Sequence, residues 1–408
     1  MRAYLIFFAM AAVASSGGWP QWGGPARNFH VDGKKLAKSW PSTGPRELWR
    51  RELGFGHSSI VTDDSGKTLF TMYRSGGDEI VIALDASTGR TLWEHRYAAP
   101  FLKGMNMDVG PGPHATPLLM DGRLYTAGVT GTLHCLNART GKVQWRKGLI
   151  EELGGTVMVR GYSSSPLSWR GTIIVQAGGP GKAVISLDAK SGKTRWSRQD
   201  FKNSHASPTL IRVNGQEQVA VLMDKVIAGI DPASGELLWS HPHDTIGDHT
   251  AGSPVWSADN LLFVSSAYDG GSRVVELTRD GGHTTAKELW AHKRMRVHHS
   301  NVIRLGDYFY ATSGDFGPAF FQAVNARTGE IRMRDRSFAR ANSLDLEDGR
   351  MLVLDEDGVL ALCAFSPDAI QVFSKAQVLE NKAWTPPTLI GTKLYLRDRK
   401  TIKALDLE

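Results

Sequence analysis

Histidine occupies the same position of a repeated tetrapeptide four times along this chain. Each tetrapeptide, such as His114-Ala115-Thr116-Pro117, precedes an apolar run typical of a strand. The position is held by His57, His114, His205 and His299, and by Trp384 near the C-terminus. An imidazole can accept a proton, attract an anion when protonated, or ligate a metal. Because the repeat makes these positions equivalent, we expect the side chains to surround one mouth of a central channel.

Charged residues stand just upstream of the same position in several repeats. They are Arg160, Lys202, Asp248, Arg296, Arg340 and Lys382. We therefore predict a cationic rim that binds an anionic small molecule through Arg160, Lys202 and Arg340, with more charge once the histidines protonate below about 6.5. His249 and His298 lie close to the equivalent position. The alternative, imidazoles that only fill a polar channel, stays open from the sequence.

We expect no metal ion shared between opposing histidines. Around a wide ring they stand too far apart for metal bonds of about 2.0–2.1 Å. His298 and His299 are adjacent in an extended segment, so their side chains point to opposite faces. The chain also lacks the His-Glu-x-x-His and Gly-x-Ser-x-Gly motifs of zinc proteases and α/β-hydrolases.

A second repeat supplies the elements that must position the histidines. In Asp85-Ala86-Ser87-Thr88-Gly89 an acidic residue and a glycine build a tight turn, and Trp93 follows in the next strand. The tryptophans at this position are Trp49, Trp93, Trp145, Trp196, Trp239 and Trp290, with Met333 and Phe373 in the last two repeats. A repeat of about 40 to 50 residues is typical of propeller blades. We expect the indoles to pack between neighbouring sheets.

Each repeat unit reads as four strands, and the eighth unit is one strand short. The strand around Trp49 has no turn before it and can complete that last unit. The prediction is an all-β, eight-bladed β-propeller in which the N-terminal strand closes the last blade, over residues 46–408. Residues 15–45 form an N-terminal segment leading into the propeller. An open β-solenoid is the alternative, although its repeats are usually shorter.

The first residues resemble a secretory signal peptide. Met1-Arg2 precedes an apolar run that ends in the small residues of Ala12-Val13-Ala14, so we place the signal at residues 1–14. No cysteine follows it to carry a lipid, and we expect a periplasmic or secreted protein. The run is too short to cross a bilayer, which takes about 20 residues. An uncleaved interfacial anchor is the alternative.

The overall charge is mildly basic, at +7. No run of basic residues resembles a nucleic-acid motif, so we expect no nucleic-acid partner. An anionic small molecule or another exported or envelope protein fits the charge better, and we expect a monomer. Cys135 and Cys363 fall in blades that are not neighbours, so they are too far apart for a disulfide.

The turn-and-tryptophan pattern resembles the docking repeat of PQQ-type eight-bladed propellers. This superfamily includes quinoprotein alcohol dehydrogenases and the propeller lipoprotein of the outer-membrane barrel-assembly machinery. The opening Trp19-Pro20-Gln21-Trp22-Gly23-Gly24 is similar to the start of exported PQQ-like repeat proteins. The dehydrogenases carry adjacent cysteines and calcium ligands, which we cannot match here. Asp269 and Asp315 are possible calcium ligands, but ordinary turn chemistry explains them better.

The resemblance leaves two functions open. The first is an exported, non-catalytic binding or assembly module that uses the histidine-rich mouth and the long connections at residues 97–113 and 147–162. The second is a PQQ-dependent dehydrogenase oxidising an alcohol or sugar. It would use PQQ with calcium, stack the cofactor on Trp384, and take His57, His114 or His205 as its base. No cofactor is predicted for the first function.

Overall fold

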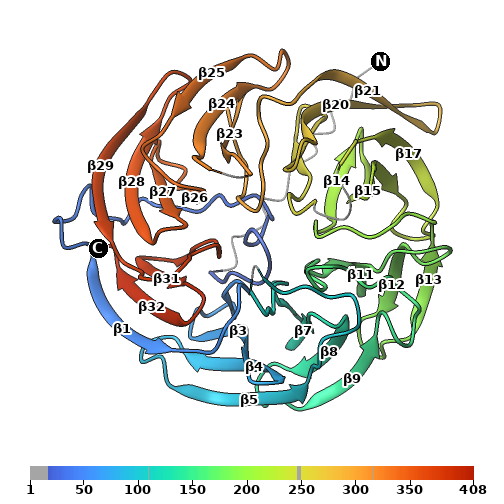
Figure 1. The fold of residues 1–408 in the computed structure, drawn as a ribbon, viewed down its shortest axis with the longest axis horizontal. Coiled ribbons are helices and arrows are strands. Elements are labelled where there is room, and N and C mark those ends of the chain that lie inside the picture. The colour runs from blue at the N-terminus through green and yellow to red at the C-terminus, as the bar shows by residue number, and fades with distance from the viewer. Residues whose placement is uncertain (1–16, 109, 246–249, 316) are drawn as a thin grey trace, which may run out of the picture.

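The computed structural model describes residues 17–108, 110–245, 250–315 and 317–408. Its regular elements are strands, arranged as eight four-stranded antiparallel sheets around a central axis (Figure 1). The predicted eight-bladed propeller is confirmed. The signal peptide at residues 1–14, together with Asp248 and His249, lies outside the described residues. In the part that is described, no helix is long and apolar enough to span a membrane.

Each of the first four blades takes its strands in chain order from the channel outward. Blade 1 comprises β2 (Val61–Thr62), β3 (Thr68–Ser75), β4 (Asp78–Asp85) and β5 (Thr91–Ala98). Blade 2 comprises β6 (Leu118–Met120), β7 (Arg123–Ala127), β8 (Thr132–Asn137) and β9 (Val143–Gly148). Blade 3 comprises β10 (Leu167–Trp169), β11 (Thr172–Gln176), β12 (Val184–Asp188) and β13 (Thr194–Arg198). Blade 4 comprises β14 (Thr209–Val213), β15 (Gln216–Met223), β16 (Val226–Ile230) and β17 (Leu237–Pro242).

The remaining blades follow the same order until the last one. Blade 5 comprises β18 (Val255–Ser257), β19 (Leu261–Ser266), β20 (Gly271–Asp280) and β21 (His283–His292). Blade 6 comprises β22 (Ile303–Leu305), β23 (Tyr308–Ser313), β24 (Phe320–Asn325) and β25 (Ile331–Asp335). Blade 7 comprises β26 (Ala341–Asp345), β27 (Met351–Asp355), β28 (Val359–Phe365) and β29 (Ile370–Gln377). Blade 8 comprises β30 (Thr388–Ile390), β31 (Lys393–Arg397), β32 (Thr401–Asp406) and, outermost, β1 (Arg46–Glu52).

The N-terminal strand closes the ring as predicted. In β1, Trp49 lies opposite Ala404 of β32, and Arg50 lies opposite Lys403. This antiparallel pairing gives blade 8 its fourth strand and joins the two ends of the chain in one sheet. The last blade therefore has the same four-stranded form as the others.

Tryptophans join neighbouring blades through a recurring hydrogen bond. The indole nitrogen donates to a backbone carbonyl in the turn of the next blade at 2.8–3.0 Å, in the pairs Trp49–Ala86, Trp93–Ala138, Trp145–Ala189, Trp196–Pro232 and Trp290–Ala326. The backbone of the turn glycine packs directly against the indole ring of the preceding blade. A Cβ on Gly192, for example, would stand 2.7 Å from the Trp145 ring. Trp196 and Trp290 are buried, whereas Trp93 and Trp145 are half-buried.

Trp239 is an exception to this docking pattern. Its indole nitrogen donates to Oε1 of Gln218 in its own blade at 2.7 Å. The following blade has a β20–β21 hairpin that turns at Gly281 and Gly282, without the Asp-Ala-x-Thr-Gly turn that offers a carbonyl elsewhere. Gln218 therefore replaces the missing acceptor. Cys135 and Cys363 are buried free thiols, as expected.

The N-terminal segment passes across the middle of the ring (Figure 1). Trp19 exchanges hydrogen bonds with Thr62 at the end of β2, and the Pro20 carbonyl accepts from Leu119 in β6. On the far side, Val31 donates to the Asp345 carbonyl of β26 at 2.8 Å. Arg27 is anchored on the Pro208 carbonyl at 3.0 Å, and burial lowers its pKa to about 10. The segment therefore bridges blades on both sides of the axis.

Candidate functional site

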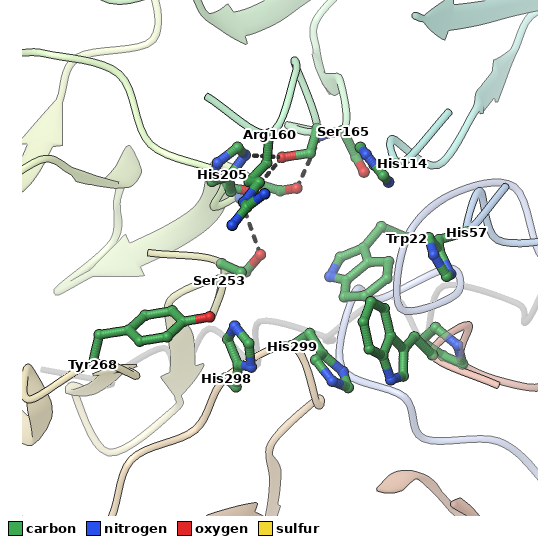
Figure 2. A pocket seen from close by; sticks show the side chains of 15 residues that line it. Trp22, His57, His114, Arg160, Ser165, His205, Ser253, Tyr268, His298 and His299 are labelled. Carbon is green, nitrogen blue, oxygen red and sulfur yellow. Dashed lines mark hydrogen bonds between the residues drawn. The ribbon is translucent and has the colours of Figure 1, made fainter. Parts of the chain in front are cut away.

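The repeated tetrapeptide places its first residue at the mouth of the channel in every blade where histidine occupies it. His57, His114, His205 and His299 each stand four residues before the first residue of an innermost strand. Trp384 does the same for β30. All five side chains line one central cavity of about 190 Å³ (Figure 2). The structure thus brings the five residues to one cavity, and their role in binding a ligand stays a prediction.

Aromatic and imidazole rings form a continuous wall on one side of the cavity. His57 stacks on His114 with ring centroids 5.7 Å apart, and on Trp384 at 5.0 Å. His299 continues the row, 4.5 Å from Trp384, and His298 follows at 5.1 Å. We call His114, His57, Trp384, His299 and His298 the ring wall. It presents mainly the carbon faces of flat side chains.

For His57, His114 and His299, the expectation that they protonate just below pH 6.5 is wrong. Burial lowers the pKa of His114 to about 3, and it lowers the pKa of His57 and of His299 well below the ordinary value of 6.5. Neighbouring positive charges add to the effect, from the other imidazoles and from arginines such as Arg399. His57, His114 and His299 are therefore uncharged at physiological pH.

Hydroxyl groups form the opposite side of the cavity. Thr116 donates its backbone N–H to Ser165 Oγ, Ser165 to Ser207 Oγ, and Ser207 to Ser253 Oγ, at 2.9–3.1 Å. These residues share one position of the repeat, so the bonds tie blades 2 to 5 together at the channel. The Ser163 hydroxyl lies 2.8 Å from His205 Nδ1. The small residues of the tetrapeptide thus serve both the fold and the cavity.

Of the three cationic side chains predicted for the site, one lines the cavity and two do not. Arg160 lines the cavity, and its guanidinium donates to the Asn106 backbone carbonyl at 3.0 Å and to Asn106 Oδ1 at 3.1 Å. Lys202 and Arg340 are not among the described lining residues. The predicted cationic rim is thereby reduced to one arginine on the wall itself.

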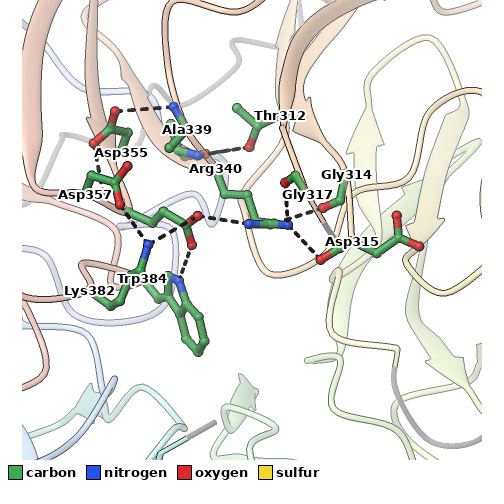
Figure 3. A network of polar contacts seen from close by, with 12 residues as sticks. Thr312, Gly314, Asp315, Gly317, Ala339, Arg340, Asp355, Asp357, Lys382 and Trp384 are labelled. Carbon is green, nitrogen blue, oxygen red and sulfur yellow. Dashed lines mark hydrogen bonds and ion pairs between the residues drawn. The ribbon is translucent and has the colours of Figure 1, made fainter.

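Arg340 belongs to a polar network beside the cavity (Figure 3). Its Nη1 lies 2.9 Å from Glu356 Oε1, and its other nitrogens donate to the Gly314 and Asp315 carbonyls. Glu356 Oε2 also accepts the indole N–H of Trp384 at 2.8 Å. The charge of Arg340 is therefore balanced by Glu356, and the network fixes the orientation of Trp384.

Sequence reasoning missed several residues that line the cavity, three of which come from different parts of the chain. Trp22 reaches it from the N-terminal segment, Tyr268 from the turn between β19 and β20, and Ser253 from the tetrapeptide of blade 5 (Figure 2). Tyr268 packs edge-on against His298 at 5.0 Å. The positive φ angles of Tyr268 and Asp269 are rare for residues with side chains, but no sequence pattern announces them.

Exposed hydrophobic side chains gather on the loops around this mouth. Of the nine large exposed hydrophobic residues that the structure describes, Phe55, Phe101, Val157 and Val159 lie in segments that lead from an outermost strand to an innermost strand. Asn106 donates to the Val159 carbonyl at 2.7 Å, so the two long loops touch. The remaining five, including Leu92 and Val143, are distributed over outermost strands.

The residues present do not fit PQQ bound through calcium. Within the described ranges, no group of three or more His, Cys, Asp or Glu side chains is placed to hold a metal ion. Asp269 forms an ion pair with Lys293 at 2.7 Å, and Asp315 forms one with Arg296 at 3.2 Å. Both carboxylates thus have charged partners. A tricarboxylate such as PQQ would also meet a single cation on the cavity wall.

Comparison with known proteins agrees with the fold. The Yersinia pestis outer membrane protein assembly factor BamB is 22% identical over 67% of this chain, and the chain spans 65% of that relative. The Burkholderia pseudomallei BamB is 21% identical over 79% of this chain and 89% of the relative. The quinohemoprotein alcohol dehydrogenase ADH-IIG of Pseudomonas putida is 30% identical, but over 32% of this chain and 20% of its own length.

Solved structures show the same architecture at low sequence identity. BamB from Moraxella catarrhalis superposes with a TM-score of 0.63 at 18% identity, covering 90% of this chain and 98% of that one. A europium-containing methanol dehydrogenase gives a TM-score of 0.71 at 11% identity, covering 94% and 89%. The sequence family described as outer membrane protein assembly factor BamB matches residues 41–110 and 77–331, more than half of the chain. With its tryptophan-docked blades and closed ring, the chain belongs to this BamB family of PQQ-like propellers.

Proposed function

We propose that this protein is an exported, non-catalytic binding module in outer-membrane protein assembly, and that it engages a partner protein at the histidine-lined mouth. The observation that carries the proposal is the group of exposed apolar side chains around the mouth, Phe55, Phe101, Val157 and Val159. Exposed apolar groups gathered on one face mark interaction sites in soluble proteins. The family assignment supplies the setting, which is assembly of the outer membrane.

The loops that carry these side chains are held in place before any partner arrives. Asn106 bridges them, since its N–H donates to Val159 and its side chain accepts from Arg160. In the same loop as Asn106, the Phe101 ring is covered by Arg74 at 4.4 Å. A pre-ordered surface loses less conformational entropy on binding, which favours a docking role.

The electrostatics of the mouth support a non-catalytic role. A general base works best when its pKa lies near the operating pH. Burial instead lowers the pKa of His114 to about 3 and that of His57 well below 6.5. These imidazoles are weak bases at neutral pH, and they serve better as flat walls of a binding site.

Site-specific cross-linking in the native host tests this proposal. A photoreactive residue at Phe101 or Val157 should cross-link to a component of the outer-membrane assembly machinery. The matched control is Val143, which is exposed on the outermost strand β9 and should give no such product. The double variant Phe101→Ser, Val157→Ser should lower the amount of folded outer-membrane protein in the cell envelope.

Two results would overturn the assembly role. Equal cross-linking from Val143 and from the mouth positions would remove the mouth as the docking face. Saturable binding of PQQ with dye-linked oxidation of an alcohol or sugar would instead establish the dehydrogenase function.

A further inference from the structure

The central cavity has two chemically different sides, and protein docking on the surrounding loops makes no use of them. The ring wall includes His57 and Trp384, with Trp22 added from the N-terminal segment. On the other side lie Arg160, Tyr268 and Ser253 (Figure 2). A ligand that fits must have a flat apolar part and a polar part on one molecule.

The flat part is specified by the rings. His57 stands between His114 and Trp384 in a stack with interplanar angles of 15° and 27°. Stacked rings of this kind favour another flat ring against them. His57 Nδ1, His114 Nε2 and both nitrogens of His299 are buried without a hydrogen-bond partner. Because these nitrogens are buried, a ligand in the cavity meets chiefly the faces of the rings.

The polar part is specified by Arg160. Asn106 holds its guanidinium through two acceptors, and the nearest carboxylate, Asp108, is 3.9 Å away and mostly exposed to solvent. An exposed pair of this kind is weak, so the positive charge stays available at the cavity. A guanidinium favours carboxylate oxygens, with which it forms strong charge-assisted hydrogen bonds. Arg160 is the one arginine or lysine among the described residues that line the cavity, and it matches one negative charge on the ligand.

Tyr268 is held at the polar side by a strained turn. Its φ is 51° and that of Asp269 is 76°, values that side chains normally avoid. Asp315 fixes the turn by accepting the Tyr268 N–H at 3.1 Å and by pairing with Arg296. Strain of this kind persists where the surrounding structure enforces it, often at binding sites.

The volume of the cavity suits a ligand with one ring. A cavity of about 150 Å³ in a protein core can hold benzene. The cavity here, about 190 Å³, holds a single ring with a short substituent. A fused three-ring tricarboxylate exceeds both this volume and the single cation available.

We propose that the central cavity binds a single-ring aromatic monocarboxylate, with its ring against His57, Trp384 and Trp22 and its carboxylate on Arg160. The site goes beyond the docking role and does not depend on it. The same chemistry is offered by a free aromatic acid and by the carboxyl-terminal aromatic residue of a polypeptide. The probes chosen must therefore separate these two sources.

Calorimetric titration of the purified protein provides the test. Phenylacetate represents the free acid, N-acetylphenylalanine the end of a polypeptide, and phenylacetamide the uncharged isostere. We expect phenylacetate or N-acetylphenylalanine to bind at least about tenfold more tightly than phenylacetamide. The tighter of the two acids identifies the source. Cyclohexylacetate, which has the charge without the aromatic ring, should bind more weakly than phenylacetate.

Two variants connect the binding to the wall residues. Arg160→Gln should bring the acid and the amide to nearly equal affinity, while Arg170→Gln, on an exposed arginine of blade 3, should change nothing. Trp22→Ala should weaken acid and amide together. Trp40→Ala, in the same N-terminal segment but outside the cavity, is its control.

Several outcomes would overturn the inference. They are the absence of binding at millimolar probe, equal affinity for acid and amide in the unaltered protein, or unchanged selectivity in Arg160→Gln. Tighter binding of PQQ than of any one-ring acid would do the same. None of these results affects the cross-linking from Phe101 and Val157, so a failure of this site is distinguishable from a failure of the assembly role.

Discussion

The tryptophan contacts between blades and the residues at the channel mouth come from the same eightfold repeat. The residue type is nearly constant at the tryptophan position and varies at the mouth position. At the outer position, five indoles donate to equivalent carbonyls at 2.8–3.0 Å. At the inner position the residue changes from His57 to Ser163, Ala251 and Trp384. Neighbouring blades must bury similar apolar faces at each junction, so a tryptophan recurs there. The mouth has no such requirement, and its departures from symmetry create a two-sided cavity.

The largest effect should come from breaking the closure of the ring. Deletion of residues 400–408 removes β32, the strand that β1 pairs with. The deletion should expose sheet edges and cause aggregation, visible by size-exclusion chromatography. Removing Gly281 and Gly282 at the tip of the β20–β21 hairpin should leave a monodisperse protein. Monodisperse protein after the C-terminal deletion would contradict closure through blade 8.

Replacement of a docking indole should have the next largest effect. Trp290→Ala removes a buried ring and the partner of the Ala326 carbonyl, so it should lower the free energy of unfolding by about 3–5 kcal/mol. Urea unfolding measures this loss. Trp384→Ala, at the mouth, should cost less stability and abolish binding in the cavity instead. A loss below about 1 kcal/mol for Trp290→Ala would show that docking is not a main source of stability.

Acid should destabilise the fold through the mouth histidines. His114 stays neutral in the folded protein down to a pKa of about 3, while the unfolded chain binds a proton near 6.5. The unfolded state therefore holds more protons below 6.5. The stability contribution is complete above that pH and falls as pH drops toward 3, by about 2 kcal/mol between pH 7 and pH 5.

Unfolding of the His114→Gln variant across this pH range is the measurement, because glutamine removes the titration. The variant should lose less stability on acidification than the unaltered protein does. His283→Gln, on an exposed hairpin histidine, is the control and should keep the original slope. Parallel stability curves for His114→Gln and the unaltered protein would mean that His114 titrates normally.

The smallest loss of stability should come from removing the side-chain acceptor of Trp239, the tryptophan that does not bond to the next blade. Gln218→Ala leaves the Trp239 indole N–H without its acceptor and should cost about 1–3 kcal/mol. Gln371→Ala, on an exposed glutamine of the outermost strand β29, provides the comparison. If Gln218→Ala is as stable as the unaltered protein, the Trp239 hydrogen bond contributes nothing to stability, and the indole acts through packing.

The sequence predicts the fold well because each blade depends on local chemistry. The Asp-x-x-x-Gly turn and the tryptophan that follows it fix a hairpin, and the short last unit at Trp384 requires a partner such as the Trp49 strand. The shared tetrapeptide position likewise predicts which histidines meet. These inferences use spacing along the chain, which the folded structure preserves.

The electrostatics and the long-range contacts could not be predicted in this way. The neutrality of His57 and His114 follows from burial beneath loops and from neighbouring charges, which spacing does not reveal. The pairing of Arg340 with Glu356 joins separate turns. Trp22 reaches the cavity only because its segment crosses the channel, a path that no local pattern encodes.

The pairing of β1 with β32 also has a kinetic consequence. Arg46 and Asp406, which form a side-chain hydrogen bond across the closing strands, are 360 residues apart in the chain. Contacts this distant form late and slowly, because the intervening chain must first be ordered. A chain that emerges N-terminus first therefore holds β1 unpaired until its last residues appear. During that interval β1 is an open strand edge, and its charged residues Arg46, Glu47, Arg50 and Arg51 can restrain mispairing until the ring closes.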